Sequence, residues 1–179
     1  DVLATAINLG TLTAAVPVQW NGVIGDSNAG ANDVDLYKFV LTAAQTVSFT
    51  TTPGIGADLA LRLFDNAGTQ LAIQNAGGVG AAETLISGIL GAGTYYLGVS
   101  SSGNVTYNPA TGAGASGGTT TGAYTLTSGN ILTPDSNSSF ATANQVGVRG
   151  TTQLTINSQI ESQGIPLPPY PGGTDEPSH

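Results

Sequence analysis

Oxygen-bearing side chains crowd one short stretch of the chain, GDSNAGANDVDLYKF. Five of them fall close together: Asp26, Asn28, Asn32, Asp33 and Asp35. Calcium binds about six to eight oxygens from carboxylates, amides and carbonyls, and alternate residues of a strand, such as Asp33 and Asp35, face the same side. The ligand order of an EF-hand is absent. Two interpretations therefore stand: a calcium site, or a tight turn capped by Asp and Asn side chains.

The groups that most enzymes need are missing. The one histidine is His179, the last residue, so a serine or cysteine nucleophile has no histidine base. Asp58 and Asp65 flank the segment LALRLF, and a strand of that length separates them by about 20 Å or more, too far for a pair of catalytic carboxylates. We therefore predict that the protein is not an enzyme and has no catalytic residues.

A long segment of small residues, GNVTYNPATGAGASGGTTT at 103–121, has two interpretations. It is either a flexible surface connection or a ligand-binding loop. In the second case the candidate contacts are Asn104, Tyr107 and Asn108, and Tyr107 is expected to be exposed, with its ring available to a polysaccharide or protein.

Charge excludes nucleic acid as a partner. The chain has three basic side chains, Lys38, Arg62 and Arg149, and a net charge of −8, whereas a nucleic-acid binder needs several Lys and Arg. Glu83 is expected to form a structural salt bridge with Lys38 or Arg62. No apolar run reaches the roughly 18 residues that a bilayer span needs. The low content of charged residues, 8%, and the absence of methionine are typical of a processed, secreted chain.

Short β-branched runs bounded by Gly, Asn and Asp predict an all-β protein. The expected strands are 16–24, 35–41, 46–51, 60–64, 71–74, 83–89, 93–100 and 122–127. In LALRLF, the leucines should occupy one face and Ala60, Arg62 and Phe64 the other. ATAINL near the start is interpreted as a loose helical turn. The predicted fold is an antiparallel β-sandwich, jelly-roll-like, with an extended C-terminal strand and a proline-rich tail.

Four motifs together resemble the bacterial pre-peptidase C-terminal (PPC) domain over residues 1–128. They are DVDLYKF, LRLFD before a glycine turn, AGTYYLGV, and GAYTL as the closing strand. The resemblance implies a non-catalytic β-sandwich module of a secreted bacterial protein, often beside a protease or another hydrolase. Relatives in bacterial collagenases bind collagen, and some members use calcium, which favours the calcium interpretation slightly.

The end of the chain repeats its beginning. LATAINLG at 3–10 aligns with FATANQVG at 140–147, so residues 135–162 look like the opening of a second module, followed by GIPLPPYPGG. We expect a sandwich at 1–129 and a linking segment at 130–179. A partial module leaves apolar side chains and backbone groups without partners. The expected inter-subunit contacts are Phe140, Val146, Leu154, Ile156, Ile160, Pro166, Pro168 and Tyr170.

These features lead to two hypotheses for function. The first is a non-enzymatic extracellular protein at the bacterial cell surface, a self-assembling fibre or surface-layer subunit that binds copies of itself by strand addition through 130–179. The alternative is an accessory module of a secreted hydrolase that binds polysaccharide or protein through the 103–121 loop. Calcium is the only cofactor that the sequence suggests.

Overall fold

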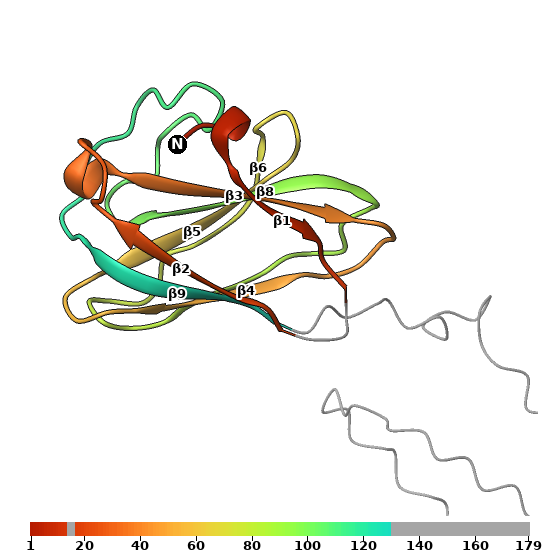
Figure 1. Ribbon diagram of the computed structural model, residues 1–179, viewed down its shortest axis with the longest axis horizontal. Helices are drawn as coiled ribbons and strands as arrows, with labels where there is room; N and C mark the ends of the chain where they lie inside the picture. The colour runs from red at the N-terminus through yellow and green to blue at the C-terminus, as the bar shows by residue number, and fades with distance from the viewer. Residues whose placement is uncertain (14–16, 130–179) are drawn as a thin grey trace, which may run out of the picture. The chain divides into compact units, whose positions relative to one another are not determined.

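The computed structural model describes residues 1–13 and 17–129 of the chain. Within these residues, nine strands form two sheets that pack face to face as a β-sandwich (Figure 1). One sheet has the order β1-β3-β8-β5-β6 and the other the order β2-β9-β4-β7. The strands are β1 Ile7–Thr11, β2 Gln19–Ile24, β3 Val34–Leu41, β4 Ser48–Pro53, β5 Leu59–Phe64, β6 Gln70–Gln74, β7 Glu83–Ile86, β8 Gly93–Ser101 and β9 Gly122–Ser128; the 3-10 helices are η1 Leu3–Thr5 and η2 Gly30–Asn32.

The predicted sandwich is confirmed, and each expected strand overlaps one of β2 to β9. The first strand, β1, was not predicted: of the segment ATAINL that was expected to form a helical turn, Ala4 and Thr5 are in η1, but Ile7 to Leu9 belong to β1. β1 pairs parallel to β3, with a register shift between Asn8 and Gly10. Gly10 has a φ of +78°, and its N–H donates to Asn8 Oδ1. The register shift leaves Leu9 without a partner in β3, and this five-residue strand is mostly exposed, so the sequence carries only a weak local signal for it.

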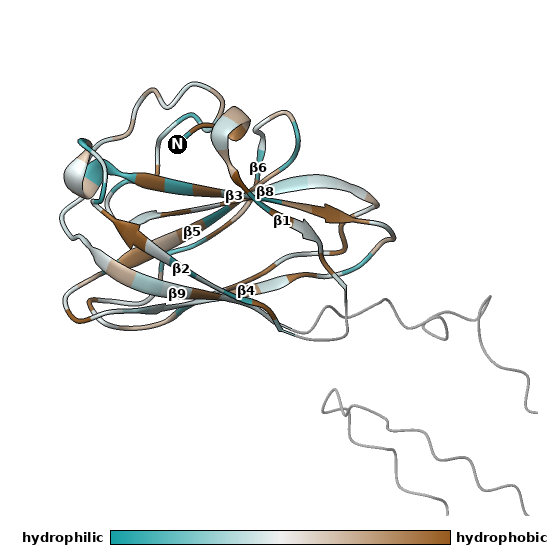
Figure 2. Ribbon diagram, viewed as in Figure 1, coloured by the Kyte–Doolittle hydropathy of each residue, from teal (hydrophilic) through white to brown (hydrophobic). Residues whose placement is uncertain are grey.

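The main core lies between the two sheets. β5 supplies Leu59, Leu61 and Leu63, which pack with Phe39 of β3 and Phe49 of β4, and the two phenyl rings are 5.2 Å apart between centroids. Figure 2 shows apolar stretches on the strands of both sheets. The prediction that the three leucines of LALRLF share one face is therefore confirmed, because all three point between the sheets.

A second, smaller core covers the outer face of the five-stranded sheet. Phe64 and Leu36 lie there with Tyr107, which comes from the 103–121 segment and is only 2% exposed. Because both faces of this sheet are covered at β5, every residue of that strand is buried.

The 103–121 segment is thus a packed cover of the sheet, and the predicted ligand loop is wrong for two of its three residues. Tyr107 and Asn104 are buried, so neither side chain can meet a polymer. Asn104 Nδ2 donates to the carbonyl of Asn32 at 2.9 Å, and its Oδ1 accepts from Ser116 N–H. Asn108 is exposed, but its Oδ1 accepts from the backbone of Ala110 and so caps a turn.

Glu83 was expected to form a salt bridge with Lys38 or Arg62, but its recorded partners are backbone groups. Glu83 is buried and accepts the backbone N–H groups of Ala76 and Gly77 instead. Arg62 lies against two aromatic rings, with its guanidinium carbon 4.4 Å from the centroid of Tyr107 and 4.7 Å from that of Phe64, and its Nε donates to Gln70 Oε1 at 2.7 Å. Its Nη1 donates to the Tyr107 carbonyl at 2.9 Å. The salt bridge was predicted from charge alone. In the structure, backbone N–H groups bind the Glu83 carboxylate, and aromatic rings and a backbone carbonyl bind the Arg62 guanidinium.

No helix in the described ranges has the length and hydropathy of a membrane span. The expected inter-subunit residues, Phe140 to Tyr170, lie outside the described residues, as does His179.

Candidate metal centre

The connection from β2 to β3 carries the aspartates that the sequence singled out. β2 ends at Ile24, and Gly25 has a φ of +99°, which lets the chain turn sharply. Asp33 closes this connection: its Oδ2 accepts Gly25 N–H at 3.0 Å and its Oδ1 accepts the Ser27 hydroxyl at 2.8 Å. The turn-capping interpretation is therefore correct for Asp33.

The same connection also brings three carboxylates together. One oxygen each of Asp26, Asp33 and Asp35 lie within 4.8 Å of one another. Asp33 and Asp35 share a side of the chain as it enters β3, and Asp26 is exposed on the facing part of the connection. Like charges at this separation repel one another, so the arrangement favours a cation or a proton.

Asp35 lies at the inner side of the cluster, where two tyrosines meet it. The Tyr124 hydroxyl donates to Asp35 Oδ2 at 2.6 Å, and the hydroxyls of Tyr124 and Tyr37 are 2.7 Å apart. Burial raises the pKa of Asp35 to about 6, with the nearby Asp33 and Asp26 acting in the same direction and the Tyr124 hydrogen bond acting against it. Burial also raises the pKa of Tyr37 to about 12 and raises that of Tyr124 well above its usual range.

The tyrosines are site residues that the sequence did not indicate. Tyr124 is on β9 and Tyr37 on β3, and the two lie 87 residues apart in the chain. Tyr37 follows Asp35 by two positions on β3, but only the packing of the two sheets brings Tyr124 to Asp35. Gly22 of β2 leaves room for the Tyr124 ring, because a Cβ at Gly22 would overlap it. The pairing of Gly22 with Tyr124 could not be found from the sequence, because it appears only when the register of β2 and β9 is known.

The two predicted asparagine ligands have other surroundings. Asn28 is exposed in the turn. The side-chain oxygen of Asn32 accepts Gly118 N–H at 2.9 Å, and thereby ties η2 to the 103–121 segment. Of the five predicted ligands, the three aspartates are the ones whose carboxylates converge.

The remaining donors fit a hard cation. Carboxylate oxygens are the ligands that calcium prefers, and the cluster borders a hollow of about 220 Å³ between the β2–β3 connection and the 103–121 segment. Asp1 also lines this hollow, and its Oδ2 accepts Leu36 N–H at 3.4 Å. No Lys or Arg side chain is among the residues that line it.

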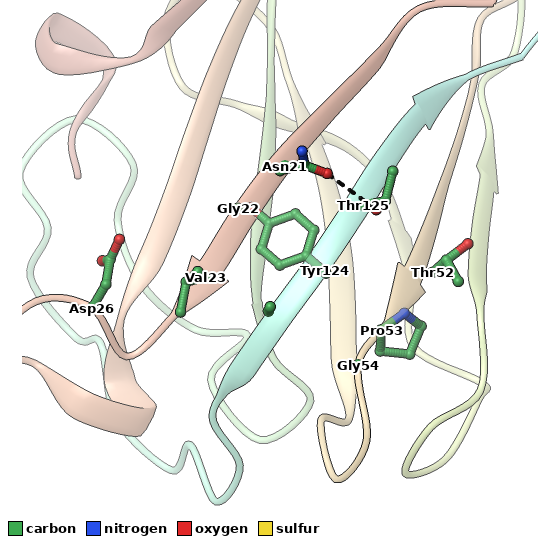
Figure 3. A pocket seen from close by; sticks show the side chains of 10 residues that line it. Asn21, Gly22, Val23, Asp26, Thr52, Pro53, Gly54, Tyr124 and Thr125 are labelled. Atoms are coloured by element: carbon green, nitrogen blue, oxygen red, sulfur yellow. Dashed lines mark hydrogen bonds between the residues drawn. The ribbon is translucent and has the colours of Figure 1, made fainter.

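A larger groove of about 520 Å³ lies on the four-stranded sheet (Figure 3). Asn21 of β2 and Thr125 of β9 share a hydrogen bond of 3.2 Å across it. Thr52 and Pro53 of β4 border one side, and Asp26 lies at the other. The groove is therefore contiguous with the aspartate cluster, and its walls are neutral apart from Asp26.

Comparison with known proteins finds similar solved structures. No curated protein matches the chain. Two solved structures are similar: the pre-peptidase C-terminal domain of collagenase from Bacillus anthracis, with 17% identity, a TM-score of 0.46, and coverage of 69% of this chain and 94% of that one; and PliG of Aeromonas hydrophila, a periplasmic inhibitor of g-type lysozyme, with 16% identity, a TM-score of 0.46, and coverage of 71% and 97%.

The family is identified by a separate match. Residues 33–101 match the family model of the bacterial pre-peptidase C-terminal domain. This range runs from Asp33 to the end of β8, and it contains three of the four motifs on which the resemblance was based. Residues 33–101 therefore carry a bacterial pre-peptidase C-terminal domain, as the sequence predicted.

Proposed function

We propose that the chain is a non-enzymatic module of a secreted bacterial protein, and that calcium bound by Asp26, Asp33 and Asp35 stabilises its sandwich. The observation that carries this proposal is the convergence of the three carboxylates within 4.8 Å. The family match supports an accessory role beside a secreted hydrolase.

Calcium would hold the β2–β3 connection against the start of β3. The three aspartates come from the two ends of that connection, so an ion between them would neutralise their mutual repulsion and fix the turn. Without the ion, Asp33 still stabilises the turn, because its carboxylate accepts hydrogen bonds from Gly25 N–H and from the Ser27 hydroxyl. Asp26 is the better reporter, since the structure records no hydrogen bond of its side chain within the described residues.

The test is thermal unfolding of the full chain in chelator and in increasing calcium. A ligand at about 100 times its dissociation constant stabilises the native state by about 2.7 kcal/mol, which raises Tm by about 10 °C for a sandwich of this size. Asp26→Asn should abolish most of this rise. Asp65→Asn is the matched control: Asp65 lies in the turn after β5, so this variant should lower the baseline Tm but keep the calcium response. A Tm that calcium does not change would refute the proposal.

Fibre formation stays a prediction, because the linking segment 130–179 lies outside the described residues. Electron microscopy of the full chain and of a chain ending at residue 129 tests whether filaments need the segment 130–179. Filaments formed only by the full chain would support strand addition. Filaments formed equally by both chains would contradict it.

Binding of a polymer by the accessory module also stays a proposal, but the predicted binding surface is replaced by another one. With Asn104 and Tyr107 buried, the groove beside Asp26 is the better candidate surface, because its lining residues come from β2, β4 and β9 and are solvent-facing in part. Co-sedimentation with insoluble collagen and with cellulose, comparing the parent chain with Thr52→Arg, tests this surface. If the Thr52→Arg variant co-sediments as well as the parent chain, the polymer does not bind in this groove.

A further inference from the structure

Two tight turns of the sandwich share one sequence pattern. The β4–β5 connection contains GIGA at 54–57, and the β6–β7 connection contains GVGA at 78–81. In each turn the alanine N–H donates to the carbonyl of the first glycine, at 3.3 Å for Ala57 and 2.8 Å for Ala81. The second glycine has a φ of +88° at Gly56 and +77° at Gly80, as the third residue of a type II turn requires. Each turn therefore presents a β-branched apolar residue at its second position.

The two turns lie side by side at one end of the sandwich. Thr51 near the end of β4 pairs with Glu83 at the start of β7, so the connection that follows β4 and the one that precedes β7 emerge together. The Gly80 N–H donates to the Ala57 carbonyl at 2.7 Å, which ties one turn to the other. The second-position residues of the pair are Ile55, which is fully exposed, and Val79, which is 66% exposed.

The surroundings of these two residues are also free of polar side chains. Residues 76–82, AGGVGAA, are all exposed, and none has a polar side chain; GIGA has none either. Exposed connections usually contain Asn, Asp or Ser beside their glycines. Single exposed apolar side chains are common, but a group of them in adjacent connections marks an interaction surface.

Backbone donors of the β6–β7 connection have partners inside the protein. Glu83 is buried, and its carboxylate accepts the N–H groups of Ala76 and Gly77. The N–H groups of Gly80 and Ala81 donate to carbonyls of the paired turns. A backbone N–H without a partner is costly in an apolar medium. These four groups need no water, so the connection is prepared for apolar surroundings.

The side chains of the paired turns favour a lipid surface over a partner protein. Protein interfaces depend on Trp, Tyr and Arg at their centre and on directional hydrogen bonds, and the two turns offer neither. Aliphatic side chains need no directional partner to enter the boundary between lipid headgroups and acyl chains. The chain has a net charge of −8 and three basic side chains, so an uncharged lipid surface is favoured over an anionic one.

We propose that the paired turns are a docking site for the surface of an uncharged lipid bilayer, into which Ile55 and Val79 insert their side chains. This docking needs neither calcium nor the segment 130–179. Two short aliphatic side chains bury less apolar surface than a myristoyl chain, which binds with an association constant of about 10⁴ M⁻¹. We therefore expect weak, reversible binding, with half of the protein bound at a lipid concentration on the order of 1 mM.

The test is flotation of the full chain with phosphatidylcholine vesicles in chelator, over a lipid series that reaches about 10 mM. Ile55→Ser and Val79→Ser should each weaken binding by about ten-fold, because each removes one buried aliphatic side chain. Ile89→Ser is the matched control and should bind as the parent chain does. Ile89 is 67% exposed, as Val79 nearly is, but it lies in the β7–β8 connection at the opposite end of β7.

A gain of affinity gives a second measurement. Val79→Trp should strengthen binding several-fold, because Trp favours the membrane–water interface, and vesicles that contain anionic phosphatidylglycerol should bind the parent chain less well. Circular dichroism checks that each variant is folded. The proposal is overturned if the parent chain does not float at the highest lipid concentration. It is also overturned if Ile55→Ser and Ile89→Ser weaken binding equally, which assigns the contact to another surface, or if binding occurs only with calcium, which assigns it to the aspartate cluster.

Discussion

Replacement of Tyr107 tests whether the 103–121 segment is a cover for the sheet or a surface for ligands. The side chain is 2% exposed, and its ring lies 6.0 Å from Phe64 and 4.4 Å from the Arg62 guanidinium. Its hydroxyl is buried without a hydrogen-bond partner in the described residues. Burial raises the pKa of this hydroxyl to about 12, so it is neutral at any ordinary pH.

The expected cost of Tyr107→Ala follows from these contacts. Truncation of a buried aromatic side chain costs about 3–5 kcal/mol, and the lost stacking on Arg62 is part of that loss. For a sandwich of this size, 1 kcal/mol corresponds to about 4 °C in Tm, so Tm should fall by about 12–20 °C. Tyr107→Phe removes only the unpartnered hydroxyl and should be neutral or stabilising by up to about 1 kcal/mol.

Urea unfolding and differential scanning calorimetry of the three proteins measure both effects. The reasoning is refuted if Tyr107→Ala lowers Tm by no more than about 2 °C, the value of a surface substitution. It is also refuted if Tyr107→Phe costs as much as Tyr107→Ala, because the hydroxyl would then carry the interaction.

Two further predictions concern the aspartate cluster and Gly118, which packs against η2. The pKa of Asp35 is raised from 3.8 to about 6 in the folded chain, so the folded state binds its proton more tightly than the unfolded state does. In chelator, the resulting stabilisation of the fold should be complete below about pH 4 and lost as pH rises through 6. The expected loss is about 2 kcal/mol after allowance for solvent screening. Asp35→Asn should flatten that pH dependence in urea unfolding, and an unchanged slope would contradict the assignment. Gly118→Ala should destabilise the fold by about 1–3 kcal/mol, because its Cβ would overlap the carbonyl of Ala31. Gly78→Ala, where a Cβ meets nothing within 4 Å, is the control, and equal unfolding midpoints of the two variants would contradict the prediction.

Local pattern in the sequence was sufficient for most of the sandwich. The leucines of β5 alternate with Ala60, Arg62 and Phe64, and that alternation fixes which face meets the other sheet. Asp33 and Asp35 were predicted to share a side, and their carboxylates do meet. β1 was missed because its local signal is weak: the strand is five residues long and mostly exposed, its pairing skips Leu9, and its hydrogen bonds come from β3.

Exposure was the property that the sequence predicted least well. Tyr107, in a run of Gly, Ser and Thr, was expected to be exposed, and it is buried on the outer face of the sheet. Glu83 was expected to pair with a basic side chain, and it accepts backbone N–H groups instead. In both cases the partner lies in another segment of the chain, and composition carries no information about which segment that is.

The sequence by itself determined the strands β2 to β9, the family of residues 33–101 and the stretch in which the aspartates lie, because period-two alternation and turn residues act over neighbouring positions. The tertiary structure alone decided that Tyr124 of β9 reaches Asp35, that the 103–121 segment covers a sheet, and that β6 is an edge. These three features depend on the order in which strands pair and on which faces are covered, and that order is set by the free energy of packing the whole sandwich.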